Sequence, residues 1–137
     1  EQADNSHILN LSPPLNMETK WFAPHVAYTM SKFGMSLCVL GMAGELKNQG
    51  IAVNALWPKT VIQTAAVKNL LGGDEVMKKA RSPEIMGDAA YTILCKDSGT
   101  CTGNYFVDED LLQSEGINDF SKYAQVPDNE LMPDFFL

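Results

Sequence analysis

An alternation of short apolar runs with longer helical patterns constrains the fold more than any other feature of this sequence. Three runs are predicted strands: "HILNLS" (7–12), "IAVNAL" (51–56) and "NYFVD" (104–108). The second run is apolar almost throughout, which is typical of a strand that is covered on both faces. Because helical patterns separate the strands, the sequence predicts an α/β fold built on a parallel sheet.

The intervening segments carry helical patterns with recognisable ends. Over 26–47, apolar side chains recur at three- and four-residue steps, and Gly50 stands where a helix end favours a left-handed residue. Further helices are predicted over 61–71, ended by two glycines at 72–73, and over 82–94. We expect a short helix near 110–115 and an irregular C-terminal extension over about 116–137.

Length and charge limit the classes of protein to consider. A chain of 137 residues fits one domain, but three strands are too few for a parallel sheet that is covered on both faces. We therefore expect residues 1–137 to be part of a larger domain, with "EQADNS" as the end of a preceding loop. The net charge of −7 and the single arginine argue against a nucleic-acid surface. No apolar run is predicted to cross a membrane.

The cysteines favour an intracellular protein without a disulfide framework. Their number, three, is odd, and no histidine lies near any of them in the sequence. Neither paired disulfides nor a zinc site is therefore predicted, and no other metal site is expected. Reduced thiols are typical of proteins kept inside the cell.

Tyr28 and Lys32 form the candidate catalytic pair. Four helical residues rise about 6 Å, which places both side chains on one face of the predicted helix. A tyrosine with a pKa of about 10 is a poor base near neutrality. An ammonium about 5 Å away would favour the phenolate by about 3 kcal/mol, or roughly two pKa units, but only in a partly enclosed cleft. Chance is the alternative, because average composition yields such a Tyr-x-x-x-Lys in roughly one chain in four.

The order of motifs around this pair resembles the short-chain dehydrogenase/reductase family. A strand ending in "ILNLS" is followed by "YTMSK" at the start of a helix, then by "IAVNALWP" and "KTVIQT". The resemblance covers about His7 to Asp108. It implies the C-terminal half of a doubly wound, parallel-sheet, Rossmann-like dinucleotide-binding fold, with the N-terminal cofactor-binding half missing from the sequence.

The resemblance also implies a role for individual residues. Tyr28 would be the catalytic acid/base, Lys32 would lower its pKa and hold the ribose hydroxyls of NADP or NAD, and Ser12 would orient the substrate. Other residues expected along the cofactor, at the end of the first strand and in the loop after "VNALW", are Asn10, Pro58, Thr60, Ile62 and Thr64.

Two positions depart from the family's pattern. By direct alignment the substrate-orienting serine falls on Pro13, so Ser12 either replaces it or the role is lost. The glycine that usually follows the loop proline is Lys59, which is expected either to contact a phosphate or, more in line with surface lysines, to be solvated.

As an activity, the resemblance implies an oxidoreductase that interconverts an alcohol and a ketone on a lipid- or fatty-acyl-like substrate. It also implies a homo-oligomer formed through the helix at 26–47. Gly34, Gly41 and Gly44 in this helix each cost about 1 kcal/mol relative to alanine, which predicts close packing against a neighbour. Together with "TGNYFVDE" and "PDFFL", the motifs resemble one branch of the family more closely, which implies a peroxisomal or mitochondrial protein; otherwise a cytoplasmic one is expected.

Two alternatives to an active enzyme remain. The sequence has no G-x-G-x-x-G turn, so the isolated polypeptide is expected neither to bind a dinucleotide tightly nor to turn over substrate. A truncated or divergent member could instead serve as a binding or assembly module. In a third interpretation the domain is of another α/β type and the pair at 28 and 32 is incidental, with its side chains on opposite faces.

Several other residues near these motifs allow two interpretations. His25 either touches substrate or, more simply, caps the helix. Trp21 and Phe22 either cover an apolar substrate or pack in the core. The acidic stretch "DEDLLQSEG" is expected to be a solvated face.

Overall fold

The computed structural model describes residues 4–137, apart from the side chains of Leu70 and Leu71. The loop expected at the N-terminus therefore falls partly outside the described residues. The chain divides into two compact units. The first contains the chain up to Trp57, residues 90–106 and Phe136, and the second contains residues 58–89, 107–135 and Leu137.

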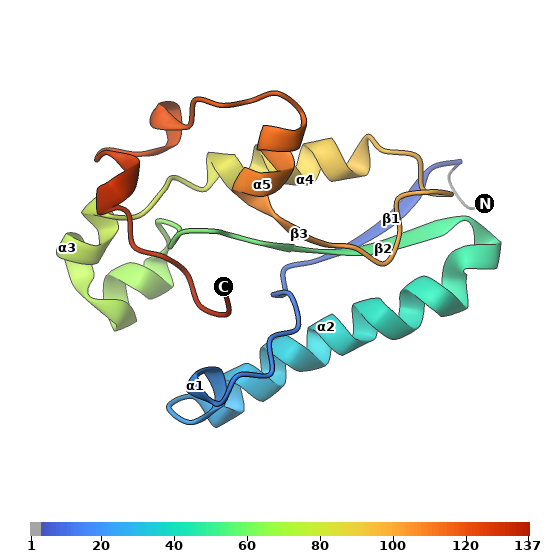
Figure 1. Ribbon diagram of the computed structural model, residues 1–137, viewed down its shortest axis with the longest axis horizontal. Coiled ribbons are helices and arrows are strands. Elements are labelled where there is room, and N and C mark those ends of the chain that lie inside the picture. The colour runs from blue at the N-terminus through green and yellow to red at the C-terminus, as the bar shows by residue number, and fades with distance from the viewer. Residues whose placement is uncertain (1–3) are drawn as a thin grey trace. The chain divides into compact units, whose positions relative to one another are not determined.

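Three strands form the sheet, in the order β1 (Ser6–Asn10), β2 (Ile51–Trp57) and β3 (Tyr105–Val107). β1 pairs with β2 in parallel, which confirms the predicted α/β class (Figure 1). Except for its first residue, β2 is fully buried, as its apolar sequence predicted. β1 is shorter than predicted at its C-terminal end, because the amide of Ser12 turns back to donate to the carbonyl of Asn10 at 3.1 Å.

Helix α2 (Val26–Leu46) runs along the strands of the first unit, and its bounds agree with the prediction (Figure 1). Val39 and Ala43 on its inner face pack against Val53 and Ala55 of β2. The helix continues into a 3-10 turn at Lys47–Gln49, after which Gly50 takes the expected left-handed conformation with a φ of 69°. This arrangement makes α2 and β2 the core of the first unit.

The three glycines of α2 are not packed closely against any other part of the described chain. A Cβ added at Gly34, Gly41 or Gly44 would meet no atom within 4 Å, so the predicted close packing is not found there. By length and composition alone, the helical stretch Val26–Gln49 could cross a membrane, so the absence of a membrane-spanning segment stays a prediction. The criterion is weak evidence, because core helices of soluble proteins also meet it, and α2 packs on the sheet.

A short helix, α1 (Thr19–Phe22), lies in the segment between β1 and α2, where only a loop was predicted. The amide of Ala23 closes it with a bond to the carbonyl of Thr19 at 3.0 Å. Four residues are too few to show a helical period in the sequence, which is why the pattern did not reveal this element.

In the second unit the predicted helix over 61–71 starts late. Thr60 and Ile62 form isolated bridges to Pro133 and Arg81, which holds the chain extended at that point. The helical part is a π-helix at Val67–Leu71. A further helix, α3 (Gly73–Lys78), was not predicted, because the glycines at 72–73 were interpreted only as a helix end.

The remaining helices lie close to their predicted positions. α4 spans Glu84–Leu94, and α5 spans Asp108–Ser114, directly after β3. Three acidic residues occupy the first turn of α5, where they complement the positive end of the helix dipole. Beyond residue 116 the structure has two 3-10 turns, at Ser121–Tyr123 and Asp128–Glu130.

Candidate active site

Tyr28 and Lys32 lie in the first two turns of α2 and border one cluster of aromatic rings. The ring of Tyr28 stacks on Phe136, with centroids 6.1 Å apart and planes inclined by 17°. The ammonium of Lys32 lies 5.2 Å from the centre of the Trp57 ring, and Trp57 in turn packs against Phe136 at 5.8 Å. The two side chains therefore share a face of the helix, as their spacing predicted, and their catalytic role stays a prediction.

The ammonium of Lys32 also fixes the segment that follows β1. Its Nζ donates to the carbonyl of Leu11 at 3.1 Å. An ammonium has three donors, so two of them are free of this bond and can reach other acceptors. Tyr28 is 43% exposed. Because water screens charges around so exposed a side chain, the predicted effect of Lys32 on the phenol requires that a cofactor, a substrate or more protein covers the ring.

Ser12 and Asn10, at the end of β1, are held close to α2. Ser36 Oγ donates to the carbonyl of Pro13 at 2.7 Å, and Asn10 Nδ2 donates to the carbonyl of Met35 at 3.4 Å. Ser12 itself is fully buried, and its hydroxyl has no hydrogen-bond partner among residues 4–137. The structure thus brings Asn10, Ser12 and Lys32 to the same end of the first unit, while the substrate-orienting role of Ser12 stays a prediction.

The other residues predicted along the cofactor belong to the second unit. Pro58 is buried, and Thr64 is exposed and accepts a hydrogen bond from the amide of Val67 at 3.3 Å. Thr60 and Ile62 lie in the extended stretch that bridges to Pro133 and Arg81. This stretch is extended rather than helical, which leaves its main chain able to run along a ligand.

The side chain of Lys59 is 41% exposed, which agrees with the expectation of a solvated lysine, and its ammonium is engaged in two ion pairs. A contact with a phosphate stays a prediction. The Nζ of Lys59 pairs with Asp110 at 2.8 Å and with Glu109 at 2.9 Å. The hydrogen bond with Asp110, followed by the one with Glu109, raises the pKa of Lys59 above its ordinary value. The acidic stretch at the start of α5 is therefore partly a set of ion-pair partners rather than a solvated face.

Asp108 and Arg81 are buried charged residues that sequence reasoning missed. Asp108 Oδ1 accepts hydrogen bonds from the amides of Lys59 at 2.8 Å and Glu109 at 2.7 Å. Burial raises the pKa of Asp108 to about 6. Arg81, 1% exposed, pairs with Glu109 and with Asp128 at 3.1 Å. The sequence offered one signal for this network: its single arginine occurs in an otherwise acidic chain.

Phe136 is the second residue that the sequence did not reveal. It is 2% exposed, and its ring contacts an aromatic cage of four side chains: Trp21, Tyr28, Phe33 and Trp57. Its φ of 75° is unusual for a bulky residue and costs about 1–3 kcal/mol. Aromatic pairs contribute about 0.5–1.5 kcal/mol each, so four ring contacts offset this cost. For Trp21 the structure shows core packing, the simpler of the two expectations.

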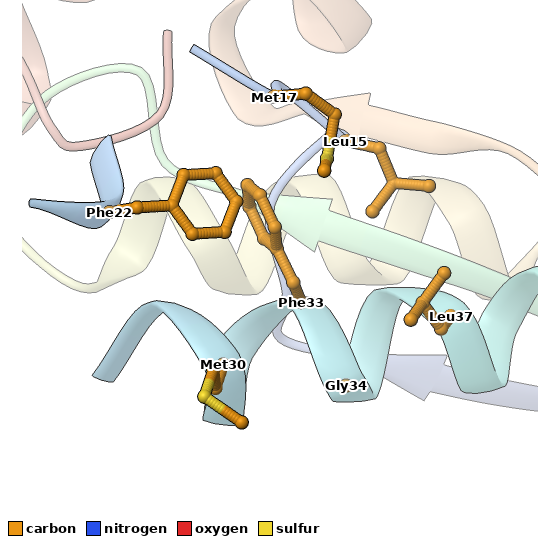
Figure 2. A pocket seen from close by; sticks show the side chains of 7 residues that line it. All are labelled: Leu15, Met17, Phe22, Met30, Phe33, Gly34 and Leu37. Atoms are coloured by element: carbon orange, nitrogen blue, oxygen red, sulfur yellow. The ribbon is translucent and has the colours of Figure 1, made fainter. Parts of the chain in front are cut away.

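An apolar pocket of about 380 Å³ lies against α2 in the first unit (Figure 2). Figure 2 shows Phe22 and Phe33 facing each other at one end of the pocket, and their rings meet edge-on at 5.3 Å. Phe33 also contacts Phe136 at 5.1 Å, which connects the pocket to the aromatic cage. The other lining residues are Leu15, Met17, Met30, Gly34 and Leu37.

Metal and thiol chemistry have few candidates in the part of the chain that the structure describes. No three His, Cys, Asp or Glu side chains within residues 4–137 are grouped so that they could hold a metal ion. Cys38, Cys95 and Cys101 are free thiols. His25 is the N-cap residue of α2, but its side chain makes no capping hydrogen bond.

Comparison of folds defines the class of protein. A short chain dehydrogenase from Mycobacterium thermoresistibile superimposes with a TM-score of 0.86 and 52% sequence identity, over 98% of this chain and 48% of the other. The angucycline C-6 ketoreductase LanV, solved with bound NADP, is 22% identical with a TM-score of 0.59 over 77% of this chain, a likeness that shows the fold alone. The structural neighbours are thus short-chain dehydrogenases, and the chain has the fold of part of such an enzyme.

Among curated proteins, the chain is similar to hydroxysteroid dehydrogenase-like protein 2 from several vertebrates. The protein of that name from Danio rerio is 58% identical over 136 residues, which are 99% of this chain. The chain spans about a third of the length of this relative, 32%. No family model matches the sequence. The resemblance that the motifs predicted is confirmed by these similarities.

Proposed function

We propose that this chain carries the proton-transferring part of a nicotinamide-dependent oxidoreductase that interconverts an alcohol and a ketone. The observation that supports this proposal is the placement of Tyr28 and Lys32 on one face of α2, beside one aromatic cage, in the element order of short-chain dehydrogenases. A tyrosine and a lysine so placed can exchange a proton with a carbonyl oxygen.

In the proposed reaction Tyr28 gives its phenolic proton to the ketone oxygen and takes it back from the alcohol in the reverse direction. The Lys32 ammonium stabilises the phenolate that remains. A nicotinamide cofactor, when bound, exchanges a hydride with the carbonyl carbon. By the family resemblance, Ser12 and Asn10 at the end of β1 are proposed to help orient the substrate.

The residues of the chain fit one end of such a cofactor. Lys32 keeps two donors beyond its bond to Leu11, and these suit the ribose hydroxyls. For the nicotinamide side, only the family resemblance suggests Pro58, Thr60, Ile62 and Thr64, which belong to the second unit. The sequence contains no glycine-rich turn to hold the pyrophosphate, so those contacts must come from protein outside this chain.

A lipid- or fatty-acyl-like ketone is the proposed substrate class. The support is apolar surface next to the candidate acid/base: the aromatic cage and the pocket that adjoins it through Phe33. Apolar walls with a few polar groups are typical of sites for such ligands. NADP and NAD both carry the ribose hydroxyls proposed to bind Lys32, so either cofactor is possible at this site. A peroxisomal or mitochondrial location is also part of the proposal.

The test uses the complete product of the gene that encodes this chain, with the isolated 137-residue chain as comparison. We expect the complete product to oxidise NADPH or NADH when offered medium- and long-chain ketones, followed by the loss of cofactor absorbance. The isolated chain is expected to show no NADPH binding at micromolar concentrations in a fluorescence titration. Micromolar binding by the isolated chain, or a complete product that oxidises neither cofactor with any ketone, would contradict the proposal.

A non-catalytic assembly module is the second candidate. The observation in its favour is the exposed apolar side of α2, where Met30, Leu37 and Leu40 are 66%, 56% and 57% exposed. The same assay separates the two candidates, because an assembly module would self-associate without turning over any ketone.

A further inference from the structure

Phe136 occupies the centre of the aromatic cage, beside both members of the candidate catalytic pair. Its ring lies nearly parallel to the ring of Tyr28, inclined by 17°. It also packs against Trp57 at 5.8 Å, and the Trp57 ring carries the ammonium of Lys32 at 5.2 Å. One buried phenylalanine is therefore in contact with the phenol directly and with the amine through a single intervening ring.

The backbone of Phe136 shows that its position is enforced by packing. It is the one non-glycine residue with a positive φ within residues 4–137, at 75°, and a phenylalanine adopts this conformation only when its surroundings hold it. The ring is 2% exposed, whereas Tyr28 is 43% exposed. The fixed ring is thus Phe136, and the ring that needs a support is Tyr28.

We propose that Phe136 is a positioning residue that fixes the orientation of the Tyr28 phenol for proton transfer. This inference rests on the proposed role of Tyr28 as the acid/base. A half-exposed tyrosine near the start of a helix samples several rotamers, while proton transfer needs the hydroxyl within hydrogen-bond reach of the substrate oxygen. Phe136 stacks on the phenol in a displaced arrangement and restricts the rotation of its ring.

Loss of the contact between Phe136 and Tyr28 is expected to lower the rate of turnover. Removing the flat ring takes away the stacking contact that Tyr28 makes with Phe136, which lowers the fraction of molecules with the hydroxyl in place. A misplacement of about 1 Å in an active site lowers turnover by up to about 100-fold. The effect belongs to kcat, because binding of the cofactor and substrate does not require the phenol to hold one rotamer.

The experiment compares four variants of the complete gene product, assayed with the ketone that it reduces fastest. Phe136→Leu keeps an apolar side chain without a ring, and Phe136→Tyr keeps the ring. Phe120→Leu is the matched control: Phe120 is also buried, at 4% exposed, but its ring contacts Tyr123 and Arg81. Tyr28→Phe tests the acid/base role itself. Circular dichroism checks folding, and kcat and KM are measured between pH 6 and pH 10.

We expect Phe136→Leu to lower kcat by roughly tenfold or more with KM within about threefold, and to change the dependence of kcat on pH. Phe136→Tyr should retain kcat, and Phe120→Leu should retain kcat even where it lowers the melting temperature. If Phe136→Leu keeps kcat within twofold of the parent while Tyr28→Phe is inactive, the inference about Phe136 is overturned and the proposed function is not. A tenfold loss in folded Phe136→Tyr would also overturn it, which covers the case that the leucine variant does not fold. An active Tyr28→Phe would instead overturn the proposed function.

Discussion

Asp108 is the residue whose environment differs most from what its position in an acidic stretch suggested. Both hydrogen bonds it accepts go to Oδ1, while Oδ2 is buried without a partner among residues 4–137. The loss of water around the carboxylate is the main cause of its raised pKa, and the two amide bonds and Arg81 oppose it. A buried carboxyl group with one oxygen unsatisfied favours its protonated form.

The raised pKa predicts how stability depends on pH. Because the folded chain holds the Asp108 proton up to a pH of about 6, whereas an unfolded aspartate releases it near 3.9, the contribution of this residue is fully present below about pH 4. The contribution of Asp108 to the free energy of unfolding decreases as the pH rises from about 4 to about 6, by up to about 3 kcal/mol in total. Above that pH it stays low. Asp108→Asn removes this dependence, so its free energy of unfolding in urea should improve relative to the parent between pH 4 and pH 7.

Asp110→Asn is the matched control for this prediction, because Asp110 lies two residues along the same helix with an exposed side chain. It should not show the same relative gain between the two pH values. If Asp108→Asn and the parent chain lose or gain stability in parallel from pH 4 to pH 7, the burial argument is wrong.

For individual residues, only those related by local spacing could be predicted from the sequence. Tyr28 and Lys32 are one helical turn apart, so their shared face followed from the period of the helix. The four ring partners of Phe136 all lie far from it in the sequence: Trp21, Tyr28, Phe33 and Trp57. No local pattern encodes such contacts, and the same holds for the bond between Asp108 and Lys59.

Among the elements, α2 connects the core with the candidate site. On the inner side of α2, Val39 and Ala43 are buried against the sheet. The first two turns of the helix carry Tyr28 and Lys32. Its bounds were predictable because apolar residues recur over more than five turns. The segment at 61–71 was not, since bridges from Thr60 and Ile62 to distant residues hold its start extended against the local helical pattern.

The outer face of α2 leads to a prediction about assembly. No atom lies within 4 Å of a Cβ built at Gly41, so Gly41→Leu fits the single chain and favours the helix by about 1 kcal/mol. If a second copy packs closely against this face, the leucine blocks its approach. We expect the variant of the complete gene product to be at least as stable as the parent but to lose its oligomeric state in light scattering.

Gly87→Leu, on α4, is the control, because a Cβ at Gly87 also meets no atom within 4 Å. It should leave the oligomeric state unchanged. An oligomer that persists in Gly41→Leu, or that is lost equally in Gly87→Leu, would exclude this face of α2 as the interface.

For the whole molecule, the order of motifs was more informative than any single one. The order of the strand ends, the long helix and the buried second strand predicted a short-chain dehydrogenase fold, and the structural neighbours confirm that fold. The connections in the second unit could not be predicted in this way. The bridges of Thr60 to Pro133 and of Ile62 to Arg81, and the pairing of Lys59 with Glu109, depend on long-range contacts.

The central claim is that the phenol of Tyr28 transfers the proton, and replacing that hydroxyl tests it most directly. Turnover of the best ketone is measured for the complete gene product and for its Tyr28→Phe and Tyr91→Phe variants. Tyr91 is the control, because it is a tyrosine on α4 that is 72% exposed. We predict that Tyr28→Phe lowers kcat by at least about 100-fold, as expected for the loss of a general acid, while Tyr91→Phe leaves it unchanged. Full turnover in Tyr28→Phe would contradict the account.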